Sequence, residues 1–222
     1  MQQATNKIIE TIHGINDGYS PRQIFCDWVK ACALCTVNSF ALIHNKIWEE
    51  REKEFKNTML KYRPETQQKF TDMLGMLCMA MDEEMTDFLG EIFMKLEAGS
   101  SHGGQFFTPY HVSVMTAKLG LEEDIKEGRK KFELYEPSVG SGGMIIAAAQ
   151  ILREAGYDYQ KCMKVVGQDL DWNAVYMTYL QLSMYGINAT VIQGDSLGRE
   201  LSISEVDPRH VFHTPMKAGI LL

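Results

Sequence analysis

A glycine-rich turn stands in the second half of this 222-residue chain, between a strand-like run and a helix-like run, and reads Glu136-Pro137-Ser138-Val139-Gly140-Ser141-Gly142-Gly143. The residues before it, 132–135, are of the types that favour a strand, and those after it, 143–155, place apolar residues at helical spacing. Glycines allow positive φ, so the backbone can turn sharply and a ligand can approach it closely. Because the free N–H groups at the start of the helix attract anions, the turn predicts a site for a carboxylate or a phosphate.

Two common nucleotide-binding motifs are excluded at this turn. The dinucleotide pattern G-x-G-x-x-G fails because Ile145 stands at its third glycine position. The P-loop pattern fails because no Gly-Lys-Ser/Thr follows. A turn that only connects strand to helix is an alternative, so neighbouring residues must decide.

The chain around the turn alternates between short strands and helices. We expect strands at 132–135, 164–167 and 189–193, with helices at 143–155 and 172–185 between them. Such a βαβαβ order forms a right-handed, mostly parallel sheet whose ligand sites lie at the carboxyl ends of the strands. The sequence therefore predicts an α/β fold for this half.

Residues 20–97 carry helical spacing and almost no strand signal. Ser20, Pro21 and Gln23 are typical of a helix start, and the stretch 70–96 has an apolar stripe that predicts burial. The sequence Gly-Ser-Ser-His-Gly-Gly at 99–104 is typical of a flexible joint. We therefore expect a helical N-terminal domain at 1–98 and a sheet domain at 99–222.

Two aspartates follow expected strands. Asp169 ends the second strand, where a carboxylate can accept both hydroxyls of a ribose, and Asp195 follows the third, where it can accept from an exocyclic amine such as that of adenine. Taken singly, each is equally well explained as a loop or helix-capping aspartate.

Composition narrows the possible partners and surroundings. The formal net charge of -7 argues against bulk electrostatic coating of nucleic acid but leaves room for a local basic groove. The odd number of cysteines, five, and the lack of a signal peptide indicate a reducing, cytoplasmic setting, and Cys32 and Cys35 have no partner pair for zinc. The longest mainly apolar stretch, 31–43, is shorter than the roughly 20 residues of a membrane span, so we expect neither a metal nor a membrane segment.

Taken together, the motifs resemble those of the N6-adenine DNA methyltransferases, most closely the modification subunit of type I restriction-modification systems. The resemblance runs from about Gly104 to Leu197 and rests on Gly104-Gln105-Phe106-Phe107-Thr108-Pro109-Tyr110 and on the glycine-rich turn, with Gly167-Gln168-Asp169 and Gly194-Asp195 in order behind them. It implies a partial Rossmann-like methyltransferase sheet behind a helical domain, with S-adenosyl-L-methionine as the cofactor.

The resemblance also implies a role for each matching residue. Gln105, Phe106 and Thr108 would line the methionine end of the cofactor, with the helix that opens at Pro109. Simple N-capping by Thr108 and Pro109 is the alternative for that pair. Glu136, Gly140 and Gly142 would hold the amino group and let the backbone pass, Asp169 would take the ribose, and Asp195 the adenine amine, with Leu170 and Leu197 as apolar contacts to the ring or, as we prefer, as core residues.

The catalytic motif of the family is absent from the sequence. Its members fit a flipped adenine at a fourth strand that ends in Asn-Pro-Pro-Tyr or Asn-Pro-Pro-Phe, whereas none of the six prolines here is adjacent to another. We expect 210–212 as a short fourth strand and His213, Thr214, Pro215 and Met216 as the degenerate remains of the motif.

Three functions therefore compete. One is a truncated adenine-specific DNA methyltransferase that needs a partner or a missing segment, and another is a non-catalytic regulatory protein that binds the cofactor. A small-molecule methyltransferase is weaker, because the resemblance is to enzymes that act on DNA.

The sheet edge beside 210–212 and the apolar tail 218–222 predict a homodimer or a partner subunit, with a monomer whose tail covers the edge as the alternative.

Overall fold

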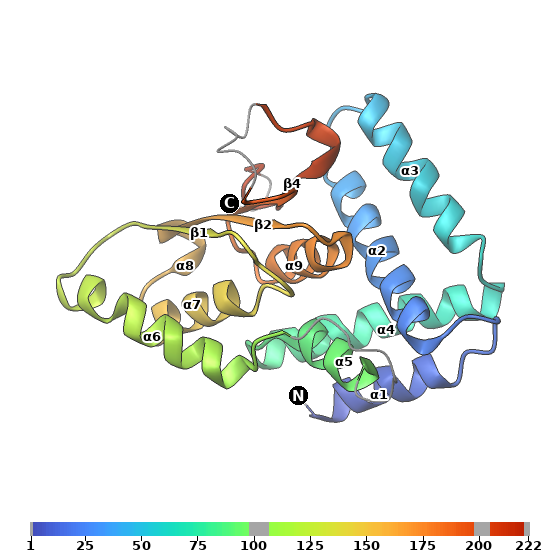
Figure 1. Ribbon diagram of the computed structural model, residues 1–222, viewed down its shortest axis with the longest axis horizontal. Helices are drawn as coiled ribbons and strands as arrows, with labels where there is room; N and C mark the ends of the chain where they lie inside the picture. Colours follow the sequence, from blue (N-terminus) through green and yellow to red (C-terminus); the bar gives the residue numbers. More distant parts are fainter. Residues whose placement is uncertain (1, 98–106, 198–204, 220–222) are drawn as a thin grey trace.

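The computed structural model describes residues 2–97, 107–197 and 205–219. The helices of the first part are α1 (Gln2–His13), α2 (Pro21–Ser39), α3 (Lys46–Met59), α4 (Pro64–Glu83) and α5 (Phe88–Glu97). The second part contains α6 (Tyr110–Lys126), β1 (Phe132–Glu136), α7 (Gly143–Glu154), α8 (Tyr159–Cys162), β2 (Met163–Asp169), α9 (Trp172–Met184), β3 (Ala189–Gln193), the 3-10 helix η2 (Pro208–His210) and β4 (Val211–His213). Figure 1 shows these elements in sequence colours.

The expected strands and helices of the second half are confirmed, with ends shifted by one or two residues. The helix expected at Pro21 also begins there, because the Ser20 side chain accepts a hydrogen bond from the backbone N–H of Gln23 at 3.2 Å. The single stripe expected over 70–96 is divided between α4 and α5. Asp87 causes this break, since its carboxylate caps the first turn of α5 at Gly90.

The sheet has the order β1-β2-β3-β4. β1, β2 and β3 are parallel, as expected, whereas β4 runs antiparallel to β3 and pairs Phe212 with Val191. Arg51 of α3 holds β4 from the outside: its guanidinium donates to the Val211 carbonyl at 2.9 Å and lies 4.5 Å from the centre of the Phe212 ring.

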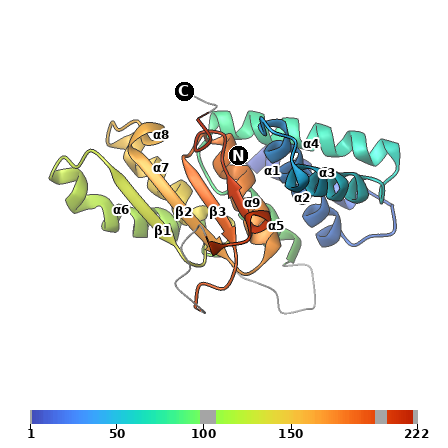
Figure 2. The same cartoon turned by 90° about the horizontal axis from the view of Figure 1, so that it is seen from above.

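Helices cover one face of this sheet. α9 packs on β2 and β3, and α6 packs along α7, as Figures 1 and 2 show. Ile145 of α7 lies 3.5 Å from the position that a Cβ atom on Gly167 of β2 would occupy. The opposite face carries polar side chains in its centre, where the Tyr135 hydroxyl bonds the Gln168 side chain at 3.1 Å and Thr190 bonds His213 at 3.1 Å. On this face Tyr135 is 59% exposed whereas Thr190 is buried, so the face meets solvent at β1 but not at β3.

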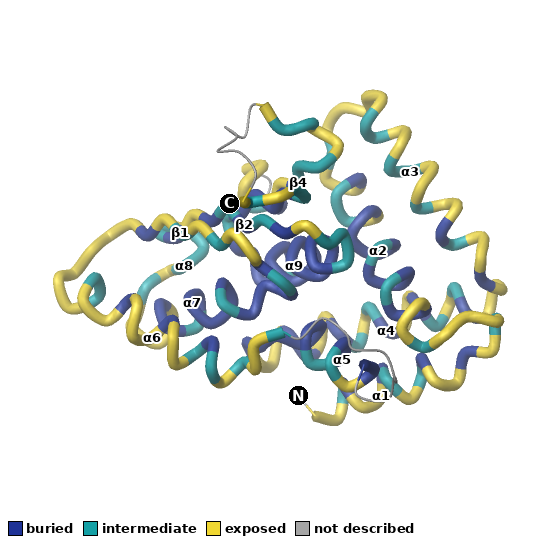
Figure 3. The backbone as a smooth tube through the Cα atoms, viewed as in Figure 1, coloured by how far each residue is buried: buried dark blue, intermediate teal, exposed yellow. Residues whose placement is uncertain are grey.

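The helical part and the sheet share one continuous hydrophobic core, which extends from Ile8 in α1 to Phe212 in β4. α9 joins them, because it packs against both α2 and α5 and is buried from Ala174 to Ser183 (Figure 3). Burial of this much apolar surface is the main stabilising contribution to such a fold. The division into domains at residues 98 and 99 stays a proposal.

Candidate cofactor site

The glycine-rich turn adopts the backbone that its glycines predict. Gly140 has φ of 57° and Gly142 has φ of 94°, both in the left-handed region. The Gly142 N–H donates to the Val139 carbonyl at 2.9 Å, and α7 begins at the next residue. No side chain caps this helix, so its first N–H groups are available to an anion.

Asp169 ties the end of β2 to this turn. One oxygen of its carboxylate, Oδ2, accepts a hydrogen bond from the Gly140 backbone N–H at 2.9 Å, and the other, Oδ1, accepts one from the Asp171 backbone N–H at 3.0 Å. The side chain is buried, with 7% of the residue exposed. Because each carboxylate oxygen accepts two hydrogen bonds, Asp169 keeps the capacity to accept from a ligand diol as well.

A cavity of about 320 Å³ opens between the turn, the end of β1 and the segment before α6. It brings together four of the expected residues, Thr108, Glu136, Gly140 and Asp169. Phe107 also lines this cavity and packs against the turn. Its ring lies 2.9 Å from the position that a Cβ atom on Gly140 would occupy. The N-capping alternative for Thr108 and Pro109 is not what the structure shows, since α6 begins at Tyr110 without a side-chain cap.

Phe107, Ser141 and Asp87 also line this cavity, and the sequence motifs assigned no role to them. Phe107 lies within the quoted motif but was given no role there, and Ser141 lies within the turn. Asp87 comes from the helical part, about fifty residues before the turn, and lines the cavity beside Ser141, whose hydroxyl donates to it. The sequence signal for Asp87 is that of a helix N-cap, because its carboxylate accepts from the backbone N–H of Gly90, three residues later.

Other expected residues lie outside this cavity. Leu170 and Leu197 are 68% and 94% exposed, so our preference for core residues was wrong. Asp195 uses one oxygen to accept from the Leu197 backbone N–H at 2.9 Å. Pro109 lines a neighbouring cavity of about 770 Å³ with Phe107 and Thr108. The Cβ position of Gly142 faces Thr178 of α9 at 3.2 Å. Gln105 and Phe106 lie outside the described residues.

The predicted position of the degenerate catalytic motif, His213, Thr214, Pro215 and Met216, was wrong. Because β4 runs antiparallel to β3, His213 pairs with Thr190 at the beginning of β3, and the segment leaves at the end of the sheet opposite to Gly140. Thr214 is buried there, and its hydroxyl donates to the Ile187 carbonyl at 2.7 Å. These four residues therefore occupy a structural position and not that of a target-base pocket.

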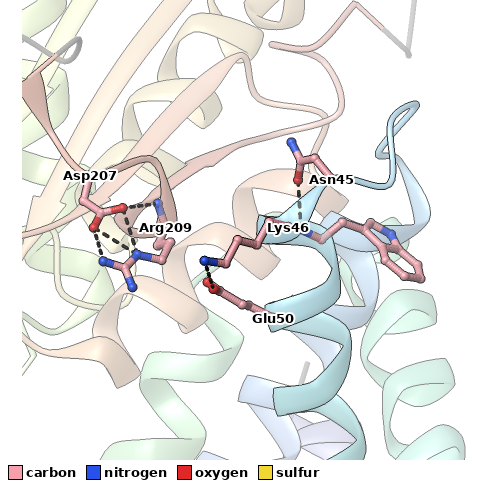
Figure 4. Close-up of polar contacts among 6 residues, drawn as sticks. Asn45, Lys46, Glu50, Asp207 and Arg209 are labelled. Carbon is pink, nitrogen blue, oxygen red and sulfur yellow. Dashed lines mark hydrogen bonds and ion pairs between the residues drawn. The ribbon is translucent and has the colours of Figure 1, made fainter.

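Another cavity, of about 690 Å³, lies between α2, α3 and α9. Its cationic side chains already have partners: Lys30 pairs with Glu54 at 2.6 Å and Lys61 with Asp27 at 3.1 Å. At its rim the pairs Lys46–Glu50 and Arg209–Asp207 face each other across the gap, and Asn45 caps α3 beside them (Figure 4). Arg51 also lines this cavity, and its guanidinium bonds the Val211 carbonyl and lies over the Phe212 ring instead of pairing with a carboxylate.

Neither a metal site nor a membrane span is evident in the described residues. No group of three or more histidine, cysteine, aspartate or glutamate side chains is placed there to hold a metal ion. None of the described helices is both long and apolar enough to cross a bilayer.

Comparison with solved structures places the fold in a known class. A protein from Listeria monocytogenes, described as a class I S-adenosylmethionine-dependent methyltransferase, superposes with a TM-score of 0.50 at 14% identity, over 91% of this chain and 56% of that one. A type I restriction-modification methyltransferase subunit from Streptococcus thermophilus aligns with 90% of this chain and 59% of its own, at 13% identity and a TM-score of 0.49. The chain therefore has a partial Rossmann-like α/β fold that is similar to the fold of the Listeria monocytogenes protein.

Sequence comparison then gives the family. The model of the N-6 DNA methylase family matches residues 84–214, more than half of the 222 residues. The chain therefore belongs to the N-6 DNA methylase family. The MjaIX methylase subunit of a type I restriction enzyme from Methanocaldococcus jannaschii is 28% identical over 109 residues, which is 49% of this chain but only 18% of that protein. The chain thus spans about a fifth of the curated relative that it matches.

Proposed function

We propose that the chain binds S-adenosylmethionine in the cavity lined by Phe107, Gly140 and Asp169. It would be the cofactor-binding part of an adenine-specific DNA methyltransferase that resembles the modification subunit of type I restriction-modification systems. The hydrogen bond between Asp169 and Gly140 carries this proposal, because it fixes a carboxylate and an open glycine turn side by side before any ligand arrives. S-adenosylmethionine is the cofactor that the family and the fold class imply. When bound, it supplies an activated methyl group on a positively charged sulfur.

The residues of the cavity fit this cofactor chemically. Glu136, whose carboxylate accepts from the Ser138 backbone N–H at 3.2 Å, retains lone pairs for the methionine ammonium. Thr108 and the first N–H groups of α6, which no side chain caps, would hold the methionine carboxylate. Asp169 would accept from the ribose hydroxyls. We further propose Gln105 and Phe106 at the methionine end.

The adenine ring would lie between the ends of β2 and β3. Leu170 and Leu197 are exposed there and would contact the ring from either side, and Asp195 would accept from its amine. Burial of these leucines by a ligand would remove apolar surface from water. Contact with the adenine ring would thus explain why these two leucines are exposed in the free protein.

Methyl transfer to DNA requires a part that this sequence lacks. The chain contains no Asn-Pro-Pro-Tyr or Asn-Pro-Pro-Phe, and no described strand pairs with the outer edge of β1. We propose that a partner subunit, or a second copy of the chain, associates in the cytoplasm and supplies the contact with DNA. β4 also ends the sheet, but Arg51 already bonds its Val211 carbonyl, so the open parallel edge at β1 supports such an association better than the edge beside 210–212.

Titration calorimetry with S-adenosylmethionine and with its demethylated product tests cofactor binding. We expect saturable binding of one ligand per chain, lost in Gly140→Arg because the large side chain fills the cavity. No heat and no thermal shift at millimolar ligand would contradict the proposal. A regulatory protein and a modification subunit would both bind, and methylation of unmethylated duplex DNA after addition of candidate partner chains distinguishes them.

A further inference from the structure

Asp87 links three parts of the chain that lie far apart in sequence. Its Oδ1 atom accepts hydrogen bonds from the Gly90 backbone N–H at 2.9 Å and from the Gln181 side chain of α9 at 2.8 Å. Its Oδ2 atom accepts one from the Ser141 hydroxyl in the glycine-rich turn. Gln181 also donates to the Ser141 carbonyl at 2.8 Å, so the network closes on itself. Through Asp87, the helical part thereby contributes a side chain to the lining of the proposed cofactor cavity.

The Asp87 carboxylate packs so closely against Gly90 and Gly143 that neither position has room for a side chain. A Cβ atom on Gly143 would lie 2.9 Å from Oδ2 of Asp87, and one on Gly90 would overlap the same atom. Asp87 itself is only 5% exposed, yet it lines the cavity. Packing of this kind fixes the position of a charge at the start of α7.

This burial is costly, because no cation compensates it. Within the described residues, no lysine, arginine or histidine forms an ion pair or a hydrogen bond with Asp87. Burial raises the pKa of its carboxyl, and the hydrogen bonds from Gln181, Ser141 and Gly90 oppose that rise. Asp27 offers a contrast: it is equally buried, but Lys61 lies 3.1 Å away and the Tyr62 hydroxyl 2.9 Å away. A buried carboxylate without a cation, at the border of a ligand cavity, points to a ligand-related role.

The cavity lining has one sign of charge. It contains the carboxyl groups of Asp87, Glu136 and Asp169, and no lysine, arginine or histidine among the described lining residues. We propose that Asp87 is a specificity residue that favours the positively charged sulfur of S-adenosylmethionine over the neutral sulfur of its demethylated product. This inference rests on the proposed function. The two ligands differ only in the methyl group on the sulfur and in the positive charge that it confers, so a change in their affinity ratio between Asp87 and a neutral replacement reports the charge.

The experiment measures the dissociation constants of both ligands by calorimetry for the full chain and for Asp87→Asn. Asparagine has the same shape and still accepts from Gly90 and Gln181, but it carries no charge. We expect the ratio of the two constants, product over S-adenosylmethionine, to fall about tenfold, the size of one charge acting across a partly buried site. Asp27→Asn is the matched control, because it neutralises a buried aspartate away from this cavity and should leave the ratio unchanged.

Two further measurements separate charge from shape. Ser141→Ala removes a donor to Asp87 but keeps its charge, so it should weaken both ligands alike. Asp87→Asn should also raise the melting temperature of the free protein at neutral pH, because it removes an uncompensated buried charge, whereas Asp27→Asn should lower it. If Asp87→Asn does not fold, Asp87→Ser keeps the helix cap without the charge and replaces it.

The outcomes distinguish this inference from the proposed function. Equal losses for both ligands in the neutral variants, or no loss, would overturn the role of Asp87 while cofactor binding stands. Failure of the unaltered chain to bind either ligand would contradict the proposed function and this inference with it.

Discussion

The carboxylate of Asp169 at the end of β2 accepts a hydrogen bond from the backbone N–H of Gly140, 2.9 Å away in the turn that follows β1. This bond joins neighbouring parallel strands at their carboxyl ends, where ligands of open α/β sheets bind. It also holds the turn in its left-handed conformation from outside the turn itself. Cofactor affinity and the local order of the turn should therefore depend on the same side chain.

Asp169→Ala should weaken the binding of S-adenosylmethionine by about 1–3 kcal/mol, since it leaves ribose hydroxyls and two backbone N–H groups without an acceptor. Calorimetry on the variant and on Asp158→Ala, which alters an exposed aspartate paired with Lys161, provides the comparison. Equal affinities of Asp169→Ala and the unaltered chain would remove Asp169 from the site.

Gly140→Ala should lower the free energy of unfolding by about 1–3 kcal/mol, because alanine resists positive φ and its Cβ atom would meet the ring of Phe107. Gly120→Ala is the control. Gly120 lies within α6 with nothing near its Cβ position, so the same change there should stabilise the helix by about 0.5–1 kcal/mol. Urea denaturation measures both; a stabilised Gly140→Ala would contradict the backbone argument.

His213 should make β4 sensitive to acid. Burial, with Lys217 and Arg51 nearby, lowers the pKa of its imidazole from the ordinary value of 6.5. The unfolded chain therefore takes up this proton at higher pH than the folded chain, and the free energy of unfolding falls as the pH drops from 6.5 through the lowered value. Denaturation at pH 8, 6.5 and 5 should show a smaller decline for His213→Asn than for the unaltered chain or for the exposed-site control His111→Asn.

The isolated chain should not transfer methyl groups to duplex DNA. The sequence lacks an Asn-Pro-Pro-Tyr or Asn-Pro-Pro-Phe segment, and His213–Met216 lies at the wrong end of the sheet to replace it. Loss of such positioning costs many orders of magnitude in rate. Radiolabelled transfer to unmethylated DNA, compared with Gly140→Arg, measures this; counts above that control would prove the prediction wrong.

Local sequence determined the elements and the turn. The strands at 132–136, 163–169 and 189–193 follow from their residue types, and α2 begins at Pro21 because Ser20 caps it. Positive φ at Gly140 and Gly142 was predictable for the same reason: each depends on one residue and its immediate neighbours. The order of strands along the chain also located Asp169 beside the turn, since parallel strands bring their carboxyl ends to one edge.

Tertiary structure alone decided the direction of β4 and the place of Asp87. A three-residue strand has too little pattern to specify its partner or its direction, and Arg51, more than a hundred residues earlier, holds it in place through Val211 and Phe212. Asp87 looks like an ordinary helix cap in the sequence. It becomes part of the cofactor cavity because α5 and α9 pack together, so that Gln181 and Ser141 meet its carboxylate. Such contacts arise between residues distant in sequence, whose proximity depends on how the whole core packs.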